Sequence, residues 1–286
     1  MNSAKHILIT GASGLLGRSL IQNFKKSSNH TIFTAGRKPE DTFQFDLKNF
    51  AALRFDCKID TLIHCSYDFD SLDLQSNLNI NLNATLELYN YSKNFGSKIF
   101  IYISSMSAHD NCKSIYGKTK LAIERQLQKY PDVIIIRPGL LYDSVINKGT
   151  LAKMVQLATN KIFVPLIDGG KQPQYATNLD DLFGFTMDAI DNPTPYLRAK
   201  PIFIGDPIKR TLKELIEIAV SKKIKSIYVP WWLAWCGLRL LEIFKVKTSF
   251  RSDSVIGLRD ASFIDEDEIL VLTKFTTKPF MPLMKV

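Results

Sequence analysis

A tyrosine and a lysine four residues apart could act as an acid/base pair. Tyr116 and Lys120 have this YxxxK spacing, which places two side chains one helical turn apart on the same helix face. An ammonium group beside a phenol stabilises the phenolate. We therefore expect Lys120 to bring the pKa of Tyr116 below its ordinary value of about 10. A nearby serine could orient a carbonyl or alcohol oxygen toward the pair.

The spacing alone does not select this pair. The sequence contains the same pattern at Tyr89/Lys93, Tyr116/Lys120 and Tyr196/Lys200. Tyr196 directly follows Pro193-Thr194-Pro195, a poor setting for a helix face, and no hydroxyl-rich strand end precedes Tyr89. Tyr116 opens an expected helix shortly after Ser105, which ends an expected strand. Open α/β sheets bind ligands at that edge, so the context favours Ser105 and the Tyr116 pair as catalytic residues.

A glycine-rich turn follows the first expected strand. Thr10-Gly11-Ala12-Ser13-Gly14-Leu15-Leu16-Gly17 has glycines at a GxxGxxG spacing, between an expected strand and an expected helix. Such a turn lets a pyrophosphate approach bare backbone and lets the helix pack close to the sheet. The phosphates then meet the helix N-terminus, where free N–H groups favour negative charge. The predicted cofactor contacts in this turn are Gly11, Ser13, Gly14, Leu15, Leu16 and Gly17.

The residues after the second expected strand bear on the choice of dinucleotide. A carboxylate at this place suits the ribose hydroxyl of NAD, whereas a basic residue suits the 2′-phosphate of NADP. Here Ala35-Gly36-Arg37-Lys38 stands at the strand end. Arg37 therefore favours NADP, with NAD as the alternative, unless Arg37 and Lys38 form only a surface pair. Asp46 and Leu47, which follow a further short apolar run, are candidates for contact with the adenine.

The elements that must position these residues alternate along the first half of the chain. Short apolar runs predict strands at 6–10, 31–35, 61–65, 98–104 and 133–137, and helical patterns occupy 15–26, 74–95 and 116–129. Continuous apolar strands alternating with helices indicate a parallel sheet covered on both faces. We expect an α/β, Rossmann-type doubly wound sheet over residues 1–165, with 176–204 packing back onto it. Residues 205–286 should form a smaller, mostly helical substrate-binding lobe.

Composition sets broad limits. The 286 residues carry 37 basic and 28 acidic side chains, a formal net charge of +9, and 45% are hydrophobic, as in an ordinary globular protein. The basic residues are scattered, which favours a solvated surface over a nucleic-acid site. The four cysteines match no zinc or disulfide pattern, and we expect no metal site. The first apolar run is too short for a secretory signal and no run reaches a membrane-spanning length, so we expect a cytoplasmic protein.

Seven motifs in order resemble the extended short-chain dehydrogenases/reductases, a superfamily of nucleotide-sugar epimerases, dehydratases and ketoreductases. After the glycine turn come Leu62-Ile63-His64-Cys65-Ser66, Asn81-Leu82-Asn83-Ala84-Thr85, Tyr102-Ile103-Ser104-Ser105, Tyr116-Gly117-Lys118-Thr119-Lys120, Arg137-Pro138-Gly139-Leu140-Leu141-Tyr142 and Ala176-Thr177-Asn178-Leu179-Asp180-Asp181-Leu182. The resemblance implies Tyr116 as acid/base, Lys120 as its activator and Ser105 as a donor that orients the substrate. It also implies cofactor contacts at Cys65, Ser66, Asn81, Tyr116, Lys120, Pro138 and Gly139.

Departures from the family pattern narrow the chemistry. Dehydratases of the family usually carry Asp-Glu after the catalytic hydroxyl, but Met106-Ser107 stands here, which argues against dehydration. The resemblance implies an NAD(P)-dependent epimerase or ketoreductase whose substrate is a nucleotide-linked sugar, and which could be a homodimer. The alternative is a dinucleotide-binding assembly or regulatory protein that keeps the fold without turnover.

Three weaker features remain. His64, at a strand end, is more consistent with a packed or hydrogen-bonded residue than with a base. The stretch from Trp231 to Trp235 favours a helix of the lobe with buried aromatic side chains over a helix lying on a membrane or a partner. Arg251 is a candidate for binding a substrate diphosphate, with a surface salt bridge as the alternative.

Overall fold

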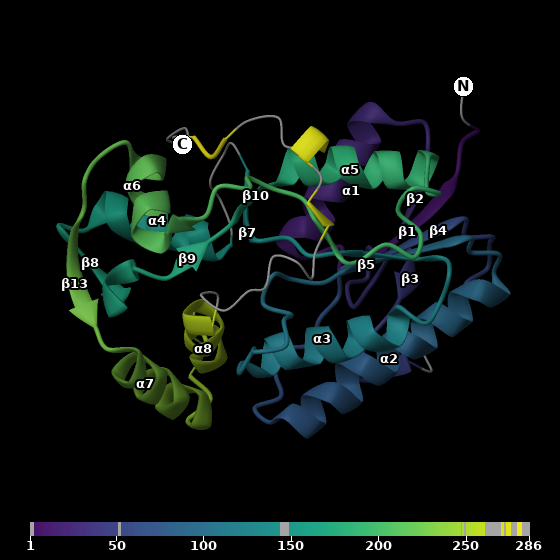
Figure 1. Cartoon of the computed structure of the whole chain (residues 1–286). Coiled ribbons are helices and arrows are strands. Elements are labelled where there is room, and N and C mark those ends of the chain that lie inside the picture. Colours follow the sequence, from purple (N-terminus) through teal and green to yellow (C-terminus); the bar gives the residue numbers. More distant parts are fainter. Residues whose placement is uncertain are drawn as a thin grey trace.

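One parallel sheet forms the centre of the molecule. The computed structural model describes residues 3–50, 53–143, 149–246, 248, 250–260, 270–271, 273–275 and 279–281. Among them, eight strands pair in parallel in the order β14-β11-β6-β5-β4-β1-β2-β3 (Figure 1). They are β1 His6–Thr10, β2 Thr31–Gly36, β3 Phe43–Gln44, β4 Thr61–His64, β5 Ile99–Ile103, β6 Val133–Ile136, β11 Ile202–Phe203 and β14 Leu270–Val271. The chain runs outward from β1 to β3 and returns to β4 on the other side of β1, which makes the switch point where such sheets bind ligands.

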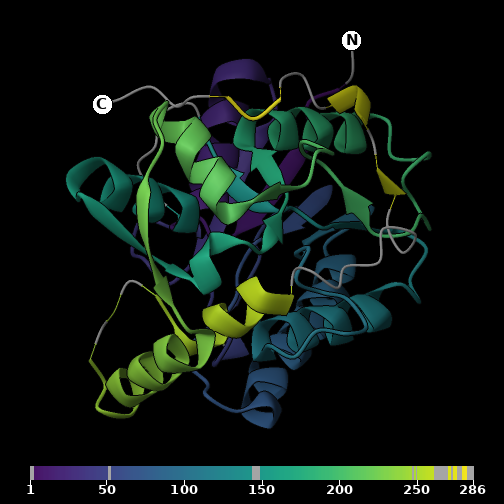
Figure 2. The same ribbon diagram turned by 60° about the vertical axis from the view of Figure 1, so that its left-hand side comes forward.

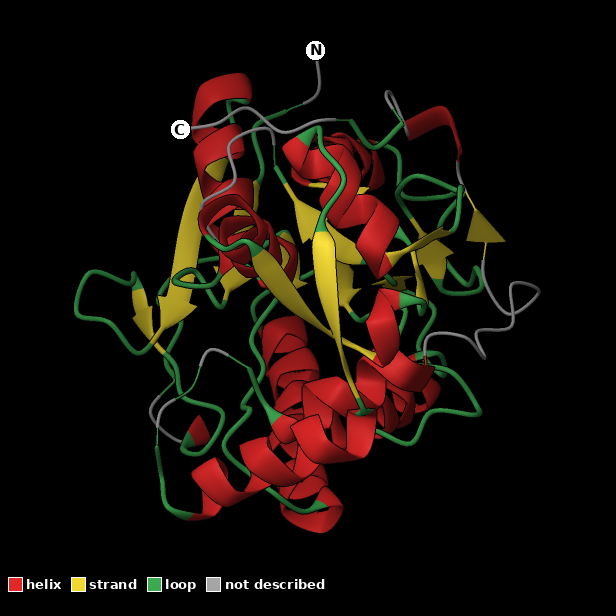
Figure 3. Ribbon diagram, turned by 90° about the vertical axis from the view of Figure 1, so that its left-hand side faces the viewer, coloured by secondary structure: helices red, strands yellow, loops and turns green. Residues whose placement is uncertain are grey.

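Helices cover both faces of this sheet. α1 (Leu15–Ser27) and α5 (Leu179–Asp191) lie on one face, and α2 (Leu74–Asn94) and α3 (Ile115–Leu127) lie on the other (Figure 1). Successive strand residues point to opposite faces. Ile7 and Ile9 accordingly belong to the core cluster under α1 and α5, whereas Leu8 belongs to the cluster under α2 and α3. Seen from the side in Figure 3, the strands lie between two layers of helices. The predicted Rossmann-type fold is confirmed.

The remaining elements form a smaller lobe beside the carboxyl ends of the central strands. Its longer elements are α4 Thr150–Asn160, β8 Phe163–Ile167, α6 Leu212–Val220, β13 Lys225–Val229, α7 Trp231–Ile243 and α8 Ser252–Asp260 (Figure 2). Its short elements are β7 Leu140–Tyr142, η2 Asp168–Gly170, β9 Pro173–Gln174, β10 Ala176–Asn178 and β12 Arg210–Thr211. η5 Thr273–Phe275 packs instead against α5 on the sheet. Its core cluster joins Leu151 and Leu166 to Leu215 and Ile216. Residues 150–167 thus pack with α6, although the predicted division at residue 165 stays a prediction.

Two local signals set the helices of the lobe. Thr211 begins α6 with a capping box: its hydroxyl accepts from the Glu214 N–H, and the Glu214 carboxylate accepts from the Thr211 N–H. Pro230 precedes α7, which forms a helix over the tryptophan stretch as predicted. The expectation that α7 buries its aromatic side chains is wrong, because none of its thirteen residues is buried.

Candidate active site

The glycine turn joins β1 to α1 through contacts that only glycine allows. Gly11 has φ +69°, and a Cβ there would lie 2.9 Å from the Ser66 backbone nitrogen. A Cβ on Gly17 would clash with the carbonyl oxygen of Gly11. The turn therefore brings the start of α1 against both the first strand and the end of β4, as the motif predicts.

The same turn leaves the start of α1 open to an anion. Ser13 and Gly14 are exposed, and Leu15 is half-buried in the wall of the main cavity. Gly14 is the N-cap of α1 and has no side chain that could cap the helix. The first turn, which includes Leu16, contains no acidic residue. The first N–H groups of α1 and the positive end of its dipole can therefore bind a pyrophosphate.

The end of β2 carries both signs of charge. Arg37 is exposed directly after the strand, and Lys38 Nζ lies 3.1 Å from a Glu40 carboxylate oxygen. Asp41, which the sequence analysis did not single out, accepts a hydrogen bond from the Lys38 N–H at 3.0 Å. Its carboxylate lies against Gly36, so closely that a Cβ on Gly36 would clash with it. A basic group and a carboxylate therefore both stand where a ribose would be bound.

Asp46 and Leu47 lie beyond the short strand β3. Both are half-buried, and Asp46 Oδ1 accepts from the Lys48 N–H at 3.0 Å. Leu47 packs against the core under α2 and α3. The Lys48 ammonium bridges Asp68 and Asp70 at 3.1 and 2.6 Å, which ties this loop to the one after β4. Contact of Asp46 or Leu47 with an adenine stays a prediction.

A hydrogen-bond chain supports the loop after β4. Thr10 Oγ1 accepts from the N–H groups of Cys65 and Ser66 at 3.1 and 3.2 Å. The Thr85 hydroxyl donates to the Asn81 carbonyl, so Thr85 Oγ1 must accept from His64 Nε2, 3.1 Å away. His64 Nδ1 then accepts from the Thr10 hydroxyl at 2.7 Å. Burial, with a smaller effect of the Lys120 charge, lowers the pKa of His64 to about 3, so His64 is a neutral structural residue, as the sequence favoured.

Asn81 holds the same loop from α2. Its side-chain oxygen accepts from the Asp68 N–H at 2.7 Å, and its amide group donates to the Asp68 carbonyl at 3.0 Å. The Asn81 amide also donates to the Asn77 carbonyl at 3.1 Å. Asn81 is 2% exposed, and these bonds go to the protein. We therefore assign it a positioning role toward Cys65 and Ser66, and its direct contact with a cofactor stays a prediction.

The structure brings Ser105, Tyr116 and Lys120 together. The Ser105 hydroxyl lies close enough to Tyr116 to lower the pKa of its phenol, and Ser105 Oγ accepts from the Ser107 N–H at 3.1 Å. Lys120 Nζ donates to the Ile103 carbonyl at 2.8 Å and lies 5.8 Å from the centre of the Tyr116 ring. Ser105 and Tyr116 both line the main cavity. The two hydroxyls are therefore placed to bind one substrate oxygen.

The expected effect of Lys120 on Tyr116 is wrong. Burial raises the pKa of Tyr116 to about 12, although the nearby Ser105 hydroxyl opposes this shift. Burial also lowers the pKa of Lys120 to about 7, because an ammonium without water is costly and only weak charges of Cys65 and Glu124 oppose the loss. Near neutral pH Tyr116 is thus a phenol ready to donate a proton, and Lys120 is the member of the pair that titrates.

The other two YxxxK matches have structural roles. Tyr89 Oη donates to Asp132 at 2.7 Å, and Lys93 forms an ion pair with the same carboxylate, so this pair fastens α2 to the loop before β6. Tyr196 lies outside any helix and hydrogen-bonds to Asp188. The context argument for Tyr116 agrees with these contacts.

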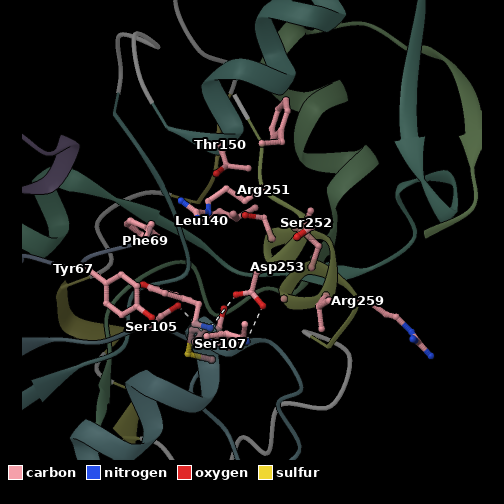
Figure 4. Close-up of a pocket in the computed structure, with 18 of the residues that line it drawn as sticks. Tyr67, Phe69, Ser105, Ser107, Leu140, Thr150, Arg251, Ser252, Asp253 and Arg259 are labelled. Atoms are coloured by element: carbon pink, nitrogen blue, oxygen red, sulfur yellow. Dashed lines mark hydrogen bonds between the residues drawn. The ribbon is translucent and has the colours of Figure 1, made fainter. Parts of the chain in front are cut away.

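Two aromatic side chains that the sequence analysis missed surround Tyr116. The Tyr67 ring meets the Tyr116 ring edge-on at 4.8 Å, and the Phe69 ring stacks on it at 5.6 Å. Tyr67 Oη donates to Asn77 at 2.6 Å. The Arg251 guanidinium lies 5.8 Å from the centre of the Phe69 ring, and Figure 4 shows these side chains on the cavity wall. Their position directly after a strand's carboxyl end was the available signal.

The lobe supplies one further contact to the active-site helix. The Asp253 carboxylate on α8 accepts from the N–H groups of Ile115 and Tyr116 at 2.7 and 2.9 Å (Figure 4). Ser114 adds an N-cap by accepting from the Gly117 N–H at 3.1 Å. A carboxylate at the positive end of a helix dipole is favourable. Burial nevertheless raises the pKa of Asp253, with the two N–H bonds opposing the shift. Asp253 therefore positions Tyr116 from the other side of the cavity.

The segment after β6 closes one side of the cavity. The Gly139 N–H donates to Thr177 Oγ1 at 2.9 Å, and a Cβ on Gly139 would clash with the Tyr175 carbonyl. Pro138 accepts from the Met106 N–H at 3.0 Å, which ties this segment to the loop after Ser105. Below it, Arg137 and Glu124 form a buried ion pair at 2.7 Å. Both Pro138 and Gly139 line the cavity.

The cavity between sheet and lobe has a volume of about 880 Å³. One wall contains Leu15, Ser105 and Tyr116, and the opposite wall is built by α7 and α8. Its cationic lining residues are Lys113, Arg239, Arg251 and Arg259. Among the described residues no group of three or more histidines, cysteines or acids is arranged for a metal ion, and none of their helices is long and apolar enough to cross a membrane.

The sequence also matches the model of a known protein family. The model of the RmlD substrate binding domain matches residues 5–195, which is about two thirds of the chain and includes the glycine turn, Ser105, Tyr116 and Lys120. The chain belongs to the RmlD substrate binding domain family. The match ends before α6, so α7, α8 and Asp253 lie outside it.

Individual relatives of this RmlD-family chain differ in their activities. It is 23% identical over 265 residues to a UDP-glucose 4-epimerase of Vibrio cholerae, covering 80% of each chain. It is 30% identical over 162 residues to methionine adenosyltransferase 2 subunit beta of Xenopus tropicalis, covering 49% of this chain and 48% of that protein. Its fold is also that of a short-chain dehydrogenase/reductase superfamily protein from Agrobacterium tumefaciens with bound NAD. That comparison has a TM-score of 0.61 and 13% identity, and covers 90% of this chain and 96% of the other.

Proposed function

We propose that this protein is a nicotinamide-dinucleotide-dependent oxidoreductase that acts on a carbonyl or alcohol carbon of a nucleotide-linked sugar. The observation that carries the proposal is that Ser105 and Tyr116 both line the cavity, with the buried Lys120 one helical turn from Tyr116. The relationship to an epimerase over most of the chain favours epimerisation, and ketoreduction is the related alternative.

The turn between β1 and α1 fits the pyrophosphate of a dinucleotide. Gly11 and Gly17 stand where a Cβ would clash, and the start of α1 has no side-chain cap. The residues proposed to hold the dinucleotide are Gly11, Ser13, Gly14, Leu15, Leu16, Gly17, Arg37, Asp46, Leu47, Cys65, Ser66, Tyr116, Lys120, Pro138 and Gly139, with Asn81 supporting the loop. When bound, the dinucleotide supplies the group that accepts or donates hydride at the substrate carbon.

We propose NADP as the preferred dinucleotide, with NAD accepted as well. Arg37 supports binding of a 2′-phosphate, and the Asp41 carboxylate beside Gly36 supports binding of a free ribose hydroxyl. Titration calorimetry of Arg37→Ser and Asp41→Ser tests this. Arg37→Ser should weaken NADPH binding and leave NADH binding intact. Equal losses for both dinucleotides in Arg37→Ser would contradict the preference.

In the proposed reaction Tyr116 exchanges the proton of the substrate oxygen. With its pKa raised by burial, Tyr116 is a phenol at neutral pH and donates toward a carbonyl oxygen. Ser105 binds the same oxygen and fixes its distance from Tyr116. Lys120 lies close enough to balance the negative charge left on Tyr116. Because Met106-Ser107 follows Ser105, the acid and base that dehydration needs are missing at that place.

The far end of the cavity suits an anionic nucleotide diphosphate. The lobe directs Arg239, Arg251 and Arg259 into the lining, and Lys113 joins them from the loop before α3. Arg251 pairs with the face of Phe69 rather than with a surface carboxylate, which supports its predicted role in binding a diphosphate. Guanidinium groups bind phosphate oxygens in pairs of hydrogen bonds.

The test is a turnover assay with the whole chain and a panel of uridine and thymidine diphosphate sugars and their keto forms. An epimerase interconverts sugars, seen by NMR, without net use of the dinucleotide, whereas a reductase consumes NADPH in proportion to product. Mass spectrometry of molecules that copurify identifies which sugars enter the panel first. Dinucleotide binding without turnover on every sugar would overturn the proposal.

That negative outcome would favour the second candidate, a dinucleotide-binding subunit of an assembly. The similarity of about half of this chain to methionine adenosyltransferase 2 subunit beta supports it. The Phe69 ring stacked on Tyr116 also narrows access to the phenol. The intact Ser105, Tyr116 and Lys120 set argues for turnover and makes this the weaker candidate.

A further inference from the structure

Helix α7 is apolar around most of its circumference, and its two charged residues lie on its half-buried side rather than toward water. Its side toward the cavity includes Trp231, Trp235, Arg239 and Glu242, all of which line the cavity. Its exposed positions are Trp232, Leu233, Cys236, Gly237, Leu240, Leu241 and Ile243, followed directly by Phe244. These positions recur with helical spacing and none of them is polar. A helix that faces water normally shows the opposite pattern.

The side chains on the inner face of α7 already have partners among neighbouring residues. Glu242 accepts from the N–H and hydroxyl of Ser252 at 2.9 and 2.6 Å, and Arg239 lies 3.7 Å from Glu242. Trp231 lies under the Arg259 guanidinium at 4.4 Å. The helix is therefore held in this orientation by specific contacts, and rotation to bury the apolar side would break them. Its outward stripe is a fixed feature of the surface.

The ribbon formed by β8 and β13 extends the same surface. Val164 and Leu166 point into the core of the lobe, whereas Phe163 and Pro165 point outward beside Lys225 and Ile227. β13 runs into α7 along the outer edge of the lobe (Figures 1 and 2). The most exposed apolar residues of α7 and of the outer side of this ribbon, with Ile162 just before β8, are Ile162 (77%), Phe244 (75%), Ile243 (59%), Leu240 (56%) and Trp232 (55%). Exposed apolar surface of this kind marks a site of interaction.

The charges in the segment that forms β13 and α7 are mostly basic, although Lys223 is paired with Glu217 at 2.9 Å. Between residues 221 and 246 the basic residues are Lys222, Lys223, Lys225, Arg239 and Lys245, and Glu242 is the one acid, a balance of 5 − 1 = +4. Glu242 faces α8, and the four lysines are exposed. Lysine beside exposed tryptophan, tyrosine, leucine and phenylalanine is the pattern of a segment that lies in the headgroup region of an anionic bilayer.

We propose that α7, with the outer face of β8 and β13, docks this protein onto an anionic membrane surface. The apolar stripe enters the region between headgroups and acyl chains, and the lysines contact lipid phosphates. A symmetric dimer through the same face fits less well, because it would bring the lysines of both copies into one interface while Glu242, the one acid of residues 221–246, faces Ser252. The proposal is independent of the reaction at Tyr116.

Binding of the whole chain to vesicles tests the proposal. We expect cosedimentation with vesicles of phosphatidylcholine containing about one third phosphatidylglycerol, and much weaker binding to phosphatidylcholine alone, since surface charge attracts basic segments. Leu240→Ser/Phe244→Ser, which changes neither the cavity lining nor the inner contacts, should weaken binding by about tenfold or more because binding scales with buried apolar area. Lys222→Ser/Lys225→Ser should remove most of the preference for the anionic vesicles.

Ile208→Ser is the matched control, because Ile208 is 54% exposed and lies outside β8, β13 and α7. It should bind vesicles like the unchanged protein. Unfolding temperature and dinucleotide binding establish that each variant is folded. The proposal is overturned by a lack of binding to either vesicle, or by equal binding of the Leu240→Ser/Phe244→Ser variant. A dimer in light scattering that this variant disperses, without vesicle binding, assigns the face to a second copy and also overturns it.

Discussion

Two helices border the cavity and distribute their side chains in opposite ways. α3 buries Lys120 and Glu124 on its inner side and exposes Lys118 and Arg125 on its outer side. α7 also turns charged residues inward, but its outer side is an apolar stripe. The inner charges of α3 meet the Ile103 carbonyl and Arg137, deep beside the sheet. The charged outer face of α3 is compatible with solvent, whereas the apolar outer face of α7 is not.

The difference between the two helices lies in what their outer sides face. The outer side of α3 carries charged residues that face water, and its inner side packs toward the sheet. α3 lies within the part of the chain that the family model covers. α7 lies outside that part, and its inner side contacts α8, Leu72 and Asp168. Glu242 on α7 and Asp253 on α8 nevertheless link the two helices, since Ser252 binds Glu242 and Asp253 caps α3. Changes at matched positions of α3 and α7 should therefore give unequal effects.

The largest difference is expected between the inner carboxylates. Glu124→Gln leaves the Arg137 guanidinium buried without a counter-charge, which should lower the free energy of unfolding by about 3–5 kcal/mol. Glu242→Gln loses a charged acceptor for Ser252 at a less buried place and should cost about 1 kcal/mol. Urea unfolding of both variants measures the difference, and equal losses would contradict the contrast between the helices.

Glycine to alanine changes should have opposite signs in the two regions. In Gly17→Ala the added methyl meets the Gly11 backbone, which should destabilise the protein by about 1–3 kcal/mol and weaken dinucleotide binding. Gly237 lies inside α7 with no heavy atom within 4 Å of its added Cβ. Gly237→Ala should therefore stabilise by about 0.5–1 kcal/mol through helix propensity. Thermal unfolding of both variants decides the signs, and a loss in Gly237→Ala would mean that α7 is packed more tightly than described.

A smaller effect should appear in the pH dependence of stability at Lys120. Its pKa is about 7 in the folded protein against 10.5 for a free lysine, so between these values the unfolded chain binds more protons and stability rises with pH. Lys120→Met removes this cost. The variant should be more stable by about 1–2 kcal/mol below pH 7, with the gain shrinking toward pH 10.

Lys118→Met, on the exposed side of α3, is the control and should change stability by no more than about 0.5 kcal/mol at any pH. Chemical denaturation at pH 6, 8 and 9.5 follows both variants. A gain for Lys120→Met that does not depend on pH would show that the buried ammonium is not the cause.

The sheet region was largely predictable from the sequence because its signals are local. The five predicted strands are short apolar runs, and each of the long helices differs from the prediction by only one or two residues at an end. The glycine turn also requires little context, since Gly11 and Gly17 are constrained by backbone within the turn and by Ser66. Ser105 and Tyr116 could be located because both follow from where β5 ends.

The rest of the site depends on contacts between distant segments. Asp253 caps α3 from a position 137 residues away from Tyr116, and no spacing in the sequence indicates that contact. The pKa shifts of Tyr116 and Lys120 depend on burial by Tyr67 and Tyr102, both close to Lys120. The exposure of α7 was mispredicted because an apolar helix looks the same in sequence whether a core, a membrane or a partner covers it.

The most direct test of the central claim compares two tyrosines from the same YxxxK pattern. Tyr116→Phe should lower turnover of the sugar nucleotide by about a hundredfold or more, while the variant stays folded and still binds the dinucleotide. Tyr89→Phe loses its hydrogen bond to Asp132 and should cost about 1 kcal/mol of stability with turnover intact. If Tyr116→Phe keeps full turnover while the dinucleotide still binds, Tyr116 is not the acid/base residue and the account of the site is wrong.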